Sequence, residues 1–233
     1  MQFHNSFHLG DCLFQLYYLR ALDQYCTFYV MASYIPELEI HNNGKIELKP
    51  LNEKTDQSID TWIGNYLFKQ LEGMSIFDSI HNRYDKIYME WFDEISMDLH
   101  IDNPFSFPIK HPELKKAPIK YDWLIINSNP LSGQWQKYDD KELDQFIREL
   151  PGYKITTRPI EGIECTNTNI LEIGKISIQS KRIIAVNTGP IVTCLNQHNI
   201  NKDFFVLTES TGYTFTKNVK ELQEITEWID KAN

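Results

Sequence analysis

The stretch IIAVNTGPIVTCLN, residues 183–196, is the most informative part of this chain. Its apolar start, Ile183 to Val186, is typical of a buried strand, and Asn187-Thr188-Gly189-Pro190 is a polar turn. An apolar segment compatible with a helix follows, and proline suits the first position of a helix. A strand, a tight turn and a helix aim unpaired backbone N–H groups at one point, which favours binding of a phosphate there.

A second junction of this form opens the chain, in residues 3–22, FHNSFHLGDCLFQLYYLRAL. Gln2 to Phe7 is predicted to be a strand, Cys12 to Gln24 a helix with a broad apolar face, and Thr27 to Ala32 a second strand. A β-α-β start favours a parallel sheet. Two such junctions far apart predict two halves that face a shared cleft, with a phosphorylated ligand between them.

The middle of the chain is less regular. Short strands are expected at Ile46 to Leu48 and near Asp60 to Ile63, and residues 64–98 are expected to be mostly helical. Residues 101–121 hold four prolines. Because proline blocks both helix continuation and ladder bonding, this segment is the best linker candidate.

An aromatic group within the helical middle has three readings. Its side chains can face the core, an acceptor or a partner subunit, and the core is the favoured reading. The group consists of Tyr84, Tyr88, Trp91 and Phe92.

From residue 122 onward strands and helices alternate in four successive β-α units. This pattern predicts a doubly wound sheet with right-handed crossovers, in which ligands bind beyond the carboxyl ends of the strands. That edge carries residues 127–137, 158–164 and 187–190. The expected strands are 122–127, 153–157, 182–186 and 204–207, and the expected helices are 139–150, 169–179, 190–196 and 219–231.

The composition of the chain limits the classes of protein to which it can belong. The 233 residues are 42% hydrophobic and 13% aromatic, which is enough for a sizeable core. A net charge of −9 argues against nucleic acid as the main partner. The four cysteines form no CxxC pair, which favours buried free thiols in a reducing compartment. With no signal peptide and no long apolar run, we expect a soluble, cytoplasmic protein without a transmembrane segment.

Two positions are candidates for chemistry at the junctions. Asp11 follows Gly10 and is either a helix N-cap or a catalytic carboxylate, and the glycine lets a ligand approach closely. Thr188-Gly189 is either a simple turn or a diphosphate site made of backbone N–H groups and a hydroxyl. His4 and His8 flank the first junction and are more often satisfied polar groups than ligand contacts.

The segment NPLSGQWQK, residues 129–137, is the third candidate. It is either an exposed turn or a loop that faces phosphate, with Ser132 or the Lys137 ammonium as donor. Asp139-Asp140 and Asp93-Glu94 are expected to cap or solvate helices. The His, Asp and Glu residues show no convincing spacing for a metal site, so none is expected.

Three stretches together resemble the lipopolysaccharide heptosyltransferase-like glycosyltransferases. LGDCLFQLYYLRAL, residues 9–22, resembles the start of that family, and IIAVNTGPIVTCLN resembles its later signature of a strand, D-T-G-P and a helix. WLIINSNPLSGQWQKYDDKELDQFIREL, residues 123–150, resembles the opening of its second domain. The resemblance covers the first 30 residues and 122–231, and does not extend to roughly 35–115.

The resemblance implies an α/β protein of GT-B-like architecture, with two Rossmann-like doubly wound domains of which the N-terminal one is reduced. Residues 1–110 would form the acceptor-side domain and 118–233 the domain that binds the nucleotide sugar, which lies between them. The family is inverting and metal-independent. It uses a nucleoside-diphosphate sugar as co-substrate and no other cofactor.

The family's site residues map onto this chain one by one. The aspartate taken as its base corresponds to Asp11, beside Gly10. Its T-G-P turn, which holds the donor diphosphate, corresponds to Thr188 and Gly189 after Asn187. Its loop lysine corresponds to Lys137 or neighbouring Gln136, near Ser132, and its contact to the donor nucleoside to Glu161 or Glu164.

Two residues depart from the family pattern. Asn187 stands where the family has aspartate, and Val192 stands where it has histidine. The chain is also shorter than typical members. These departures leave the donor and the extent of activity open.

The resemblance implies a glycosyltransferase that moves a sugar from a nucleoside-diphosphate donor to a glycan or glycolipid hydroxyl. Peripheral contact with a membrane is compatible with such an acceptor. One alternative is a nucleotide-sugar-binding protein that has lost catalysis. Others are a fucosyltransferase-like GT-B enzyme that uses a guanine nucleotide, and an interaction protein in which both junctions are mere turns.

Overall fold

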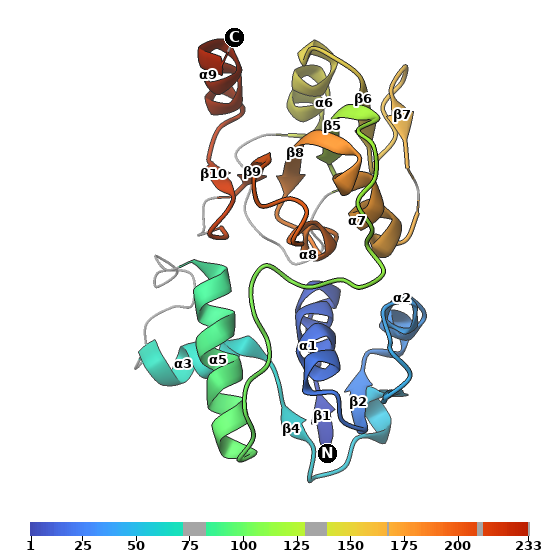
Figure 1. The fold of residues 1–233 in the computed structure, drawn as a ribbon, viewed down its shortest axis with the longest axis vertical. Coiled ribbons are helices and arrows are strands. Elements are labelled where there is room, and N and C mark those ends of the chain that lie inside the picture. Colours follow the sequence, from blue (N-terminus) through green and yellow to red (C-terminus); the bar gives the residue numbers. More distant parts are fainter. Residues whose placement is uncertain (72–82, 129–138, 167, 209–211, 233) are drawn as a thin grey trace. The chain divides into compact units, whose positions relative to one another are not determined.

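Two parallel β-sheets organise the chain (Figure 1). The computed structural model describes residues 1–71, 83–128, 139–166, 168–208 and 212–232. Each sheet belongs to its own compact unit, Met1–Ile109 for unit 1 and Lys110–Asn233 for unit 2.

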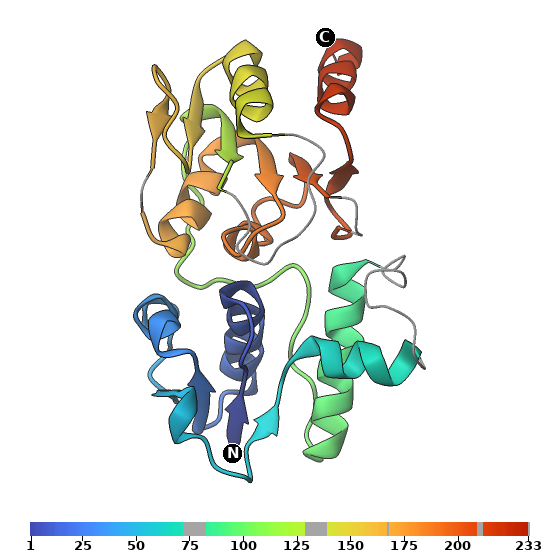
Figure 2. The same cartoon turned by 180° about the vertical axis from the view of Figure 1, so that it is seen from behind.

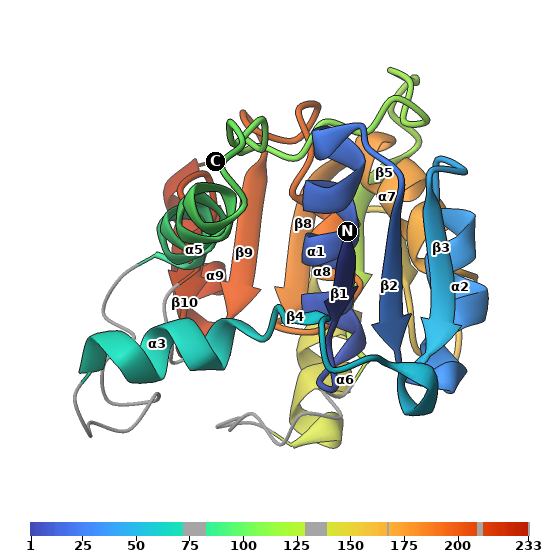
Figure 3. The ribbon, with the colours of Figure 1, turned by 90° about the horizontal axis from the view of Figure 1, so that it is seen from below.

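Unit 1 contains a four-stranded sheet in the order β3-β2-β1-β4, with each pair parallel. Figure 3 shows β1, β2 and β3 side by side with their arrowheads at the same end. The strands are β1 (Gln2–His4), β2 (Cys26–Val30), β3 (Ile46–Pro50) and β4 (Ile59–Asp60). The helices are α1 (Leu9–Leu22), α2 (Ile35–Ile40), α3 (Ile63–Leu71) and α5 (Tyr84–Asp98), with 3-10 turns η1 (Ala32–Tyr34) and η2 (Leu51–Glu53).

Helices α1 and α5 pack through stacked aromatic rings. The rings of Tyr18 and Phe92 lie 4.3 Å apart, and those of Phe14 and Tyr88 lie 4.2 Å apart. Tyr88, Trp91 and Phe92 are buried, which confirms the core reading of the aromatic group for these three side chains. Figures 1 and 2 both show α3 lying across α5, and the two helices are in contact.

The first junction is built differently from the prediction. β1 ends at His4 rather than Phe7, and α1 begins at Leu9 rather than Cys12. The Asn5 side chain accepts a hydrogen bond from the Phe7 N–H at 2.7 Å, which turns the chain out of the strand early. Gly10 and Asp11 therefore lie inside the first helical turn, where a carboxylate complements the positive end of the helix dipole.

Unit 2 contains a six-stranded parallel sheet in the order β10-β9-β8-β5-β6-β7. Numbered within the unit this is 3-2-1-4-5-6, the Rossmann order. The strands are β5 (Tyr121–Ile126), β6 (Lys154–Thr156), β7 (Glu164–Cys165), β8 (Ser180–Val186), β9 (Asp203–Leu207) and β10 (Lys217–Val219). The helices are α6 (Asp140–Glu149), α7 (Ile170–Ile178), α8 (Ile191–Cys194) and α9 (Leu222–Ala232).

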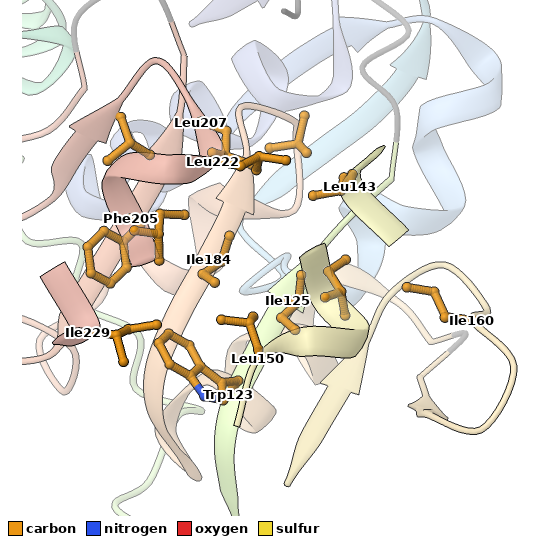
Figure 4. Packing of buried hydrophobic residues seen from close by; sticks show 14 residues of the cluster. Trp123, Ile125, Leu143, Leu150, Ile160, Ile184, Phe205, Leu207, Leu222 and Ile229 are labelled. Atoms are coloured by element: carbon orange, nitrogen blue, oxygen red, sulfur yellow. The ribbon is translucent and has the colours of Figure 1, made fainter. Parts of the chain in front are cut away.

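Both faces of the unit 2 sheet are buried, as a parallel sheet requires. On one face Trp123, Ile184 and Phe205 of neighbouring strands lie beneath side chains of α6 and α9, such as Leu143 and Ile229 (Figure 4). Along β5 the alternate residues Leu124 and Ile126 are equally buried. The α/β fold with two Rossmann-like parallel sheets is thus confirmed.

Several unit 2 elements differ from the prediction. β7 and β10 were not expected, because runs of two and three residues carry no readable alternation. The terminal helix begins at Leu222 rather than 219, since 217–219 pair with β9. Asp139 caps α6 as expected and accepts from the Glu142 N–H at 2.7 Å.

A glycine at the α7–α8 contact gives a test of this packing. A Cβ at Gly174 would lie 2.9 Å from the Thr193 Cβ, which is too close for two carbon atoms. Gly174→Ala is therefore expected to destabilise by about 1–3 kcal/mol through overpacking, although alanine is the better helix former. A thermal melt measures this, with Lys175→Ala in the same helix as the control. A raised melting temperature for Gly174→Ala would contradict the packing.

Candidate functional site

The order of strands in unit 1 reverses between β1 and β4. In open α/β sheets ligands bind beyond the carboxyl ends of the strands at such a reversal. The chain leaving β1 there carries His8 and Asp11, and the chain leaving β4 carries Trp62. The Trp62 ring stacks on that of Phe7, with centroids 3.8 Å apart.

The Asp11 carboxylate is held from two sides. Its Oδ1 accepts a hydrogen bond from the Tyr88 hydroxyl at 2.7 Å, although the two residues are 77 positions apart. Its Oδ2 lies 3.6 Å from Nδ1 of His8, at the N-cap of α1. Asp11 provides no cap, because it is the third helical residue and Tyr88 orients its carboxylate. The capping alternative is therefore wrong.

The basicity of two neighbouring groups responds to this carboxylate. The hydrogen-bonding interaction with Asp11 raises the pKa of His8 above its usual value, against a smaller opposing effect of burial. Burial chiefly raises the pKa of Tyr34, and electrostatic interactions with Cys12 and Asp11 add to this effect. The site thus combines a fixed carboxylate with an imidazole that is a stronger base than usual.

The tight glycine turn expected before Asp11 does not form. Gly10 is the second residue of α1 and is not among the glycines with positive φ. Gly10 has no side chain, and this feature still favours close approach of a ligand to the first turn of the helix.

In unit 2 the strand order reverses between β5 and β8. The residues beyond their carboxyl ends are Asn127 and Ser128 after β5, and Asn187, Thr188 and Gly189 after β8. The sequence-predicted turn therefore lies at the position where this fold binds its ligands.

The turn at Thr188 offers fewer donors than expected. α8 has four residues instead of the predicted seven, so its dipole is weak. The N–H groups of Ile191 and Val192 already donate to the carbonyls of Thr188 and Gly189, at 3.0 and 3.1 Å. The Thr188 hydroxyl oxygen is buried and has no hydrogen-bond partner among the described residues. An unpaired buried hydroxyl is costly, which is consistent with a place for a ligand.

A buried amide ties the carboxyl ends of β5 and β6 together. Asn127 is fully buried, and its Oδ1 accepts from the N–H groups of Thr157 and Arg158 at 3.1 and 2.8 Å. Arg158 pairs with Asp144 of α6 at 2.6 Å, and its side chain is 27% exposed. Arg158 is thus a cation held at the carboxyl edge of the sheet. A basic residue directly after a strand is the sequence signal that could have singled it out.

The other predicted site residues are scattered. Ser132, Lys137 and the alternative Gln136 lie outside the described residues. Glu161 is exposed in the connection after β6, whereas Glu164 bonds Tyr121 at 2.9 Å near the amino ends of the strands. Asn187 is half-buried, and Val192 is buried, so position 192 faces the interior.

The structure also bears on metal and membrane chemistry. Among the residues it describes, no three His, Cys, Asp or Glu side chains gather in a way that would hold a metal ion. Within that same part of the chain, no helix combines the length and apolar character needed to cross a bilayer. The cysteines are free thiols, with Cys12, Cys26 and Cys194 buried, as expected.

These two parallel sheets, each with a reversal of strand order, form an α/β fold that is similar to the fold of solved heptosyltransferases. Escherichia coli heptosyltransferase WaaC, in complex with ADP-2-deoxy-2-fluoro heptose, has a TM-score of 0.59 to this chain at 8% identity, with 100% of both chains covered. A glycosyl transferase of family 9 from Veillonella parvula DSM 2008 has a TM-score of 0.51 at 10% identity, with 100% of this chain and 91% of that chain covered.

A third similar structure is the iron-containing dodecameric glycosyltransferase TibC from enterotoxigenic E. coli H10407. Its TM-score is 0.50 at 12% identity, with 95% of this chain and 64% of that chain covered. No protein-family model matches the chain, and comparison with curated proteins gives no significant match. The heptosyltransferase-like resemblance of the sequence is therefore confirmed at the level of the fold.

The Asn127 amide gives a prediction for the unit 2 edge. Asn127→Ala removes the Oδ1 acceptor of the Arg158 N–H, and it removes one of the two acceptors of the Thr157 N–H, which keeps its bond to the Ile125 carbonyl. The expected loss is about 1–3 kcal/mol of unfolding free energy. Chemical denaturation measures it, and Asn43→Ala, which loses only an exposed turn bond to the Lys45 N–H, is the control. Equal effects of the two substitutions would show that the Asn127 amide does not hold this edge together.

Proposed function

We propose that the protein is a glycosyltransferase that moves a sugar from a nucleoside-diphosphate donor to the hydroxyl of a glycan or glycolipid. Transfer inverts the anomeric centre and needs no metal ion. Unit 2 binds the donor at the β5–β8 reversal through Asn187, Thr188 and Gly189. Unit 1 binds the acceptor and supplies the base around Asp11.

The observation that carries this proposal is the Asp11 carboxylate, fixed by Tyr88 at the sheet reversal of a heptosyltransferase-like fold. An acceptor hydroxyl has a very high pKa, so a base must take its proton as the new bond forms. Asp11 is polar, partly exposed and held in one orientation, which suits it to this chemistry.

The leaving nucleoside diphosphate needs stabilisation by local donors, because the protein as a whole has a net charge of −9. Arg158 is a cation at the carboxyl edge of unit 2, and the unpaired Thr188 hydroxyl is an available donor once a ligand reorganises the turn. Lys137 and Ser132 belong to the proposed donor site from their sequence alone, and Glu161 is the proposed contact to the nucleoside.

A second candidate is a nucleotide-sugar-binding protein without catalysis. Asn187 and the buried Val192 replace an aspartate and a histidine of the family pattern, and the four-residue α8 adds little positive potential. The fixed Asp11 carboxylate favours the enzyme, because a binding protein has no use for an oriented base.

Nucleotide binding is the first test. Thermal shifts with ADP, UDP, GDP and CMP and their common sugar conjugates are expected to show one preferred base. ADP-heptose deserves inclusion because the similar heptosyltransferase WaaC was solved with an ADP-sugar. Ligand at about 100 times its Kd adds roughly 2.7 kcal/mol of stability, which a melt detects. Preference for GDP selects the fucosyltransferase-like alternative, and no shift with any nucleotide counts against the transferase.

Replacement of the carboxylate separates the enzyme from the binding protein. Asp11→Asn keeps the size of the side chain but removes its charge. It is expected to lower transfer by at least about 100-fold while leaving nucleotide affinity nearly unchanged. Calorimetry and a product assay measure the two quantities. Equal loss of both would mean that Asp11 has a structural role.

A further inference from the structure

Both oxygens of the Asp11 carboxylate already face a protein group. Oδ1 accepts from the Tyr88 hydroxyl, and Oδ2 faces His8 Nδ1. The Asp11 side chain is 20% exposed and that of His8 is 52% exposed. The imidazole is therefore the part of this group that an acceptor reaches most easily.

We propose that His8 takes the proton of the acceptor at its Nε2 atom, and that Asp11 and Tyr88 form a chain of positioning residues behind it. This inference rests on the proposed transferase function and changes the identity of the base. Tyr88 orients Asp11, Asp11 orients His8, and His8 contacts the acceptor hydroxyl.

The relative basicity of the two groups supports this order. An ordinary imidazole has a pKa near 6.5 and an ordinary aspartate one near 3.9, so a proton shared by the pair resides on the histidine. With Nδ1–H directed at the carboxylate, Nε2 carries the free lone pair. The 3.6 Å separation of Nδ1 and Oδ2 exceeds a normal hydrogen bond, and catalytic contacts of this kind tighten when substrate binds.

The surroundings of His8 act on its protonation in opposite directions. Its place at the N-cap of α1 opposes a positive charge, because the helix N-terminus is itself positive. The Asp11 carboxylate favours that charge and raises the pKa of His8. The other titratable groups around the carboxylate are Tyr34 of η1, Tyr88 of α5 and Cys12 of α1. Burial raises the pKa of both the Cys12 thiol and the Tyr34 hydroxyl, so these two groups stay neutral near pH 7.

With His8 as the base, every bond and proton of the transfer step is accounted for. The acceptor O–H bond breaks, and its proton goes to His8 Nε2. The acceptor oxygen forms a bond to the anomeric carbon as the bond from that carbon to the diphosphate oxygen breaks. The bonding electron pair leaves with the nucleoside diphosphate, and the imidazolium formed at His8 is stabilised by Asp11.

The test compares His8→Gln, Asp11→Asn and the double variant in full-length protein, with the donor that the binding panel identifies. His8→Gln removes the base without a lost cap, because His8 makes no side-chain capping bond. It is expected to lower kcat by about 10²–10⁴-fold with little change in donor KM. The double variant is expected to be no worse than the poorer single variant, since residues that act as a unit are non-additive.

The pH profile gives an independent readout. The base must be unprotonated, so wild-type kcat/KM is expected to rise as pH increases through the pKa of His8, above about 6.5. In His8→Gln this acid limb is expected to move down toward the range of a carboxylate. In Asp11→Asn it is expected to shift toward lower pH, because the group that raises the pKa of His8 is gone.

Tyr88→Phe tests the positioning role against a matched control. It removes the hydroxyl that holds Asp11 and is expected to lower kcat about tenfold. Tyr18→Phe removes a buried hydroxyl bonded to Ser96 across the same pair of helices, at 2.6 Å, without touching Asp11. It is expected to lower stability similarly and to leave kcat unchanged.

Two outcomes overturn the inference in distinguishable ways. In the first, the wild-type protein is active and the His8→Gln variant keeps the kcat and the acid limb of the pH profile. The base is then Asp11 rather than His8, and the transferase proposal stands. Absence of transfer with every donor and acceptor overturns both proposals together.

Discussion

Parallel pairing of the strands determines both the layers of each unit and the position of its polar edges. Because every described strand pairs in parallel with its neighbours, each connection must cross back over the sheet, and helices cover the faces that this leaves apolar. The same constraint brings the carboxyl ends of all strands of a sheet to one edge. Where the order reverses, at β1–β4 and at β5–β8, the connections diverge and expose that edge.

Polar side chains hold these edges in place through long-range hydrogen bonds. Asn127 binds the backbone of Thr157 and Arg158, and Tyr88 binds Asp11 from another helix. Such bonds stabilise the edge where the backbone ladder ends, and they orient the polar groups that lie there. In each unit a buried amide or hydroxyl thus fixes the positions of the groups at the carboxyl edge of the sheet.

The two strand-to-helix junctions show which structural features the local sequence predicts correctly and which it does not. The apolar run 183–186 is β8, and the residues after it lie at the reversal in unit 2, as predicted. The helix after that turn is four residues long, because Leu195 leaves the helical conformation and the chain turns toward β9. At the first junction Asn5 turned the strand early, and the start of α1 moved to Leu9. A hydrogen bond between a side chain and the backbone two residues on has no signature in hydrophobic periodicity.

The amino-acid sequence alone predicted the α/β class, most of the strands of unit 2 and the positions of Asp11 and Thr188 close to the carboxyl edges of the sheets. Those features follow from local patterns of apolar residues, turns and helix starts, which short windows contain. Three features became visible in the folded chain alone: Tyr88 of α5 holds the Asp11 carboxylate, Asn127 joins β5 to β6, and position 192 is buried. These contacts join residues up to 77 positions apart, so they exist only once packing of the helices and strands has brought their side chains together.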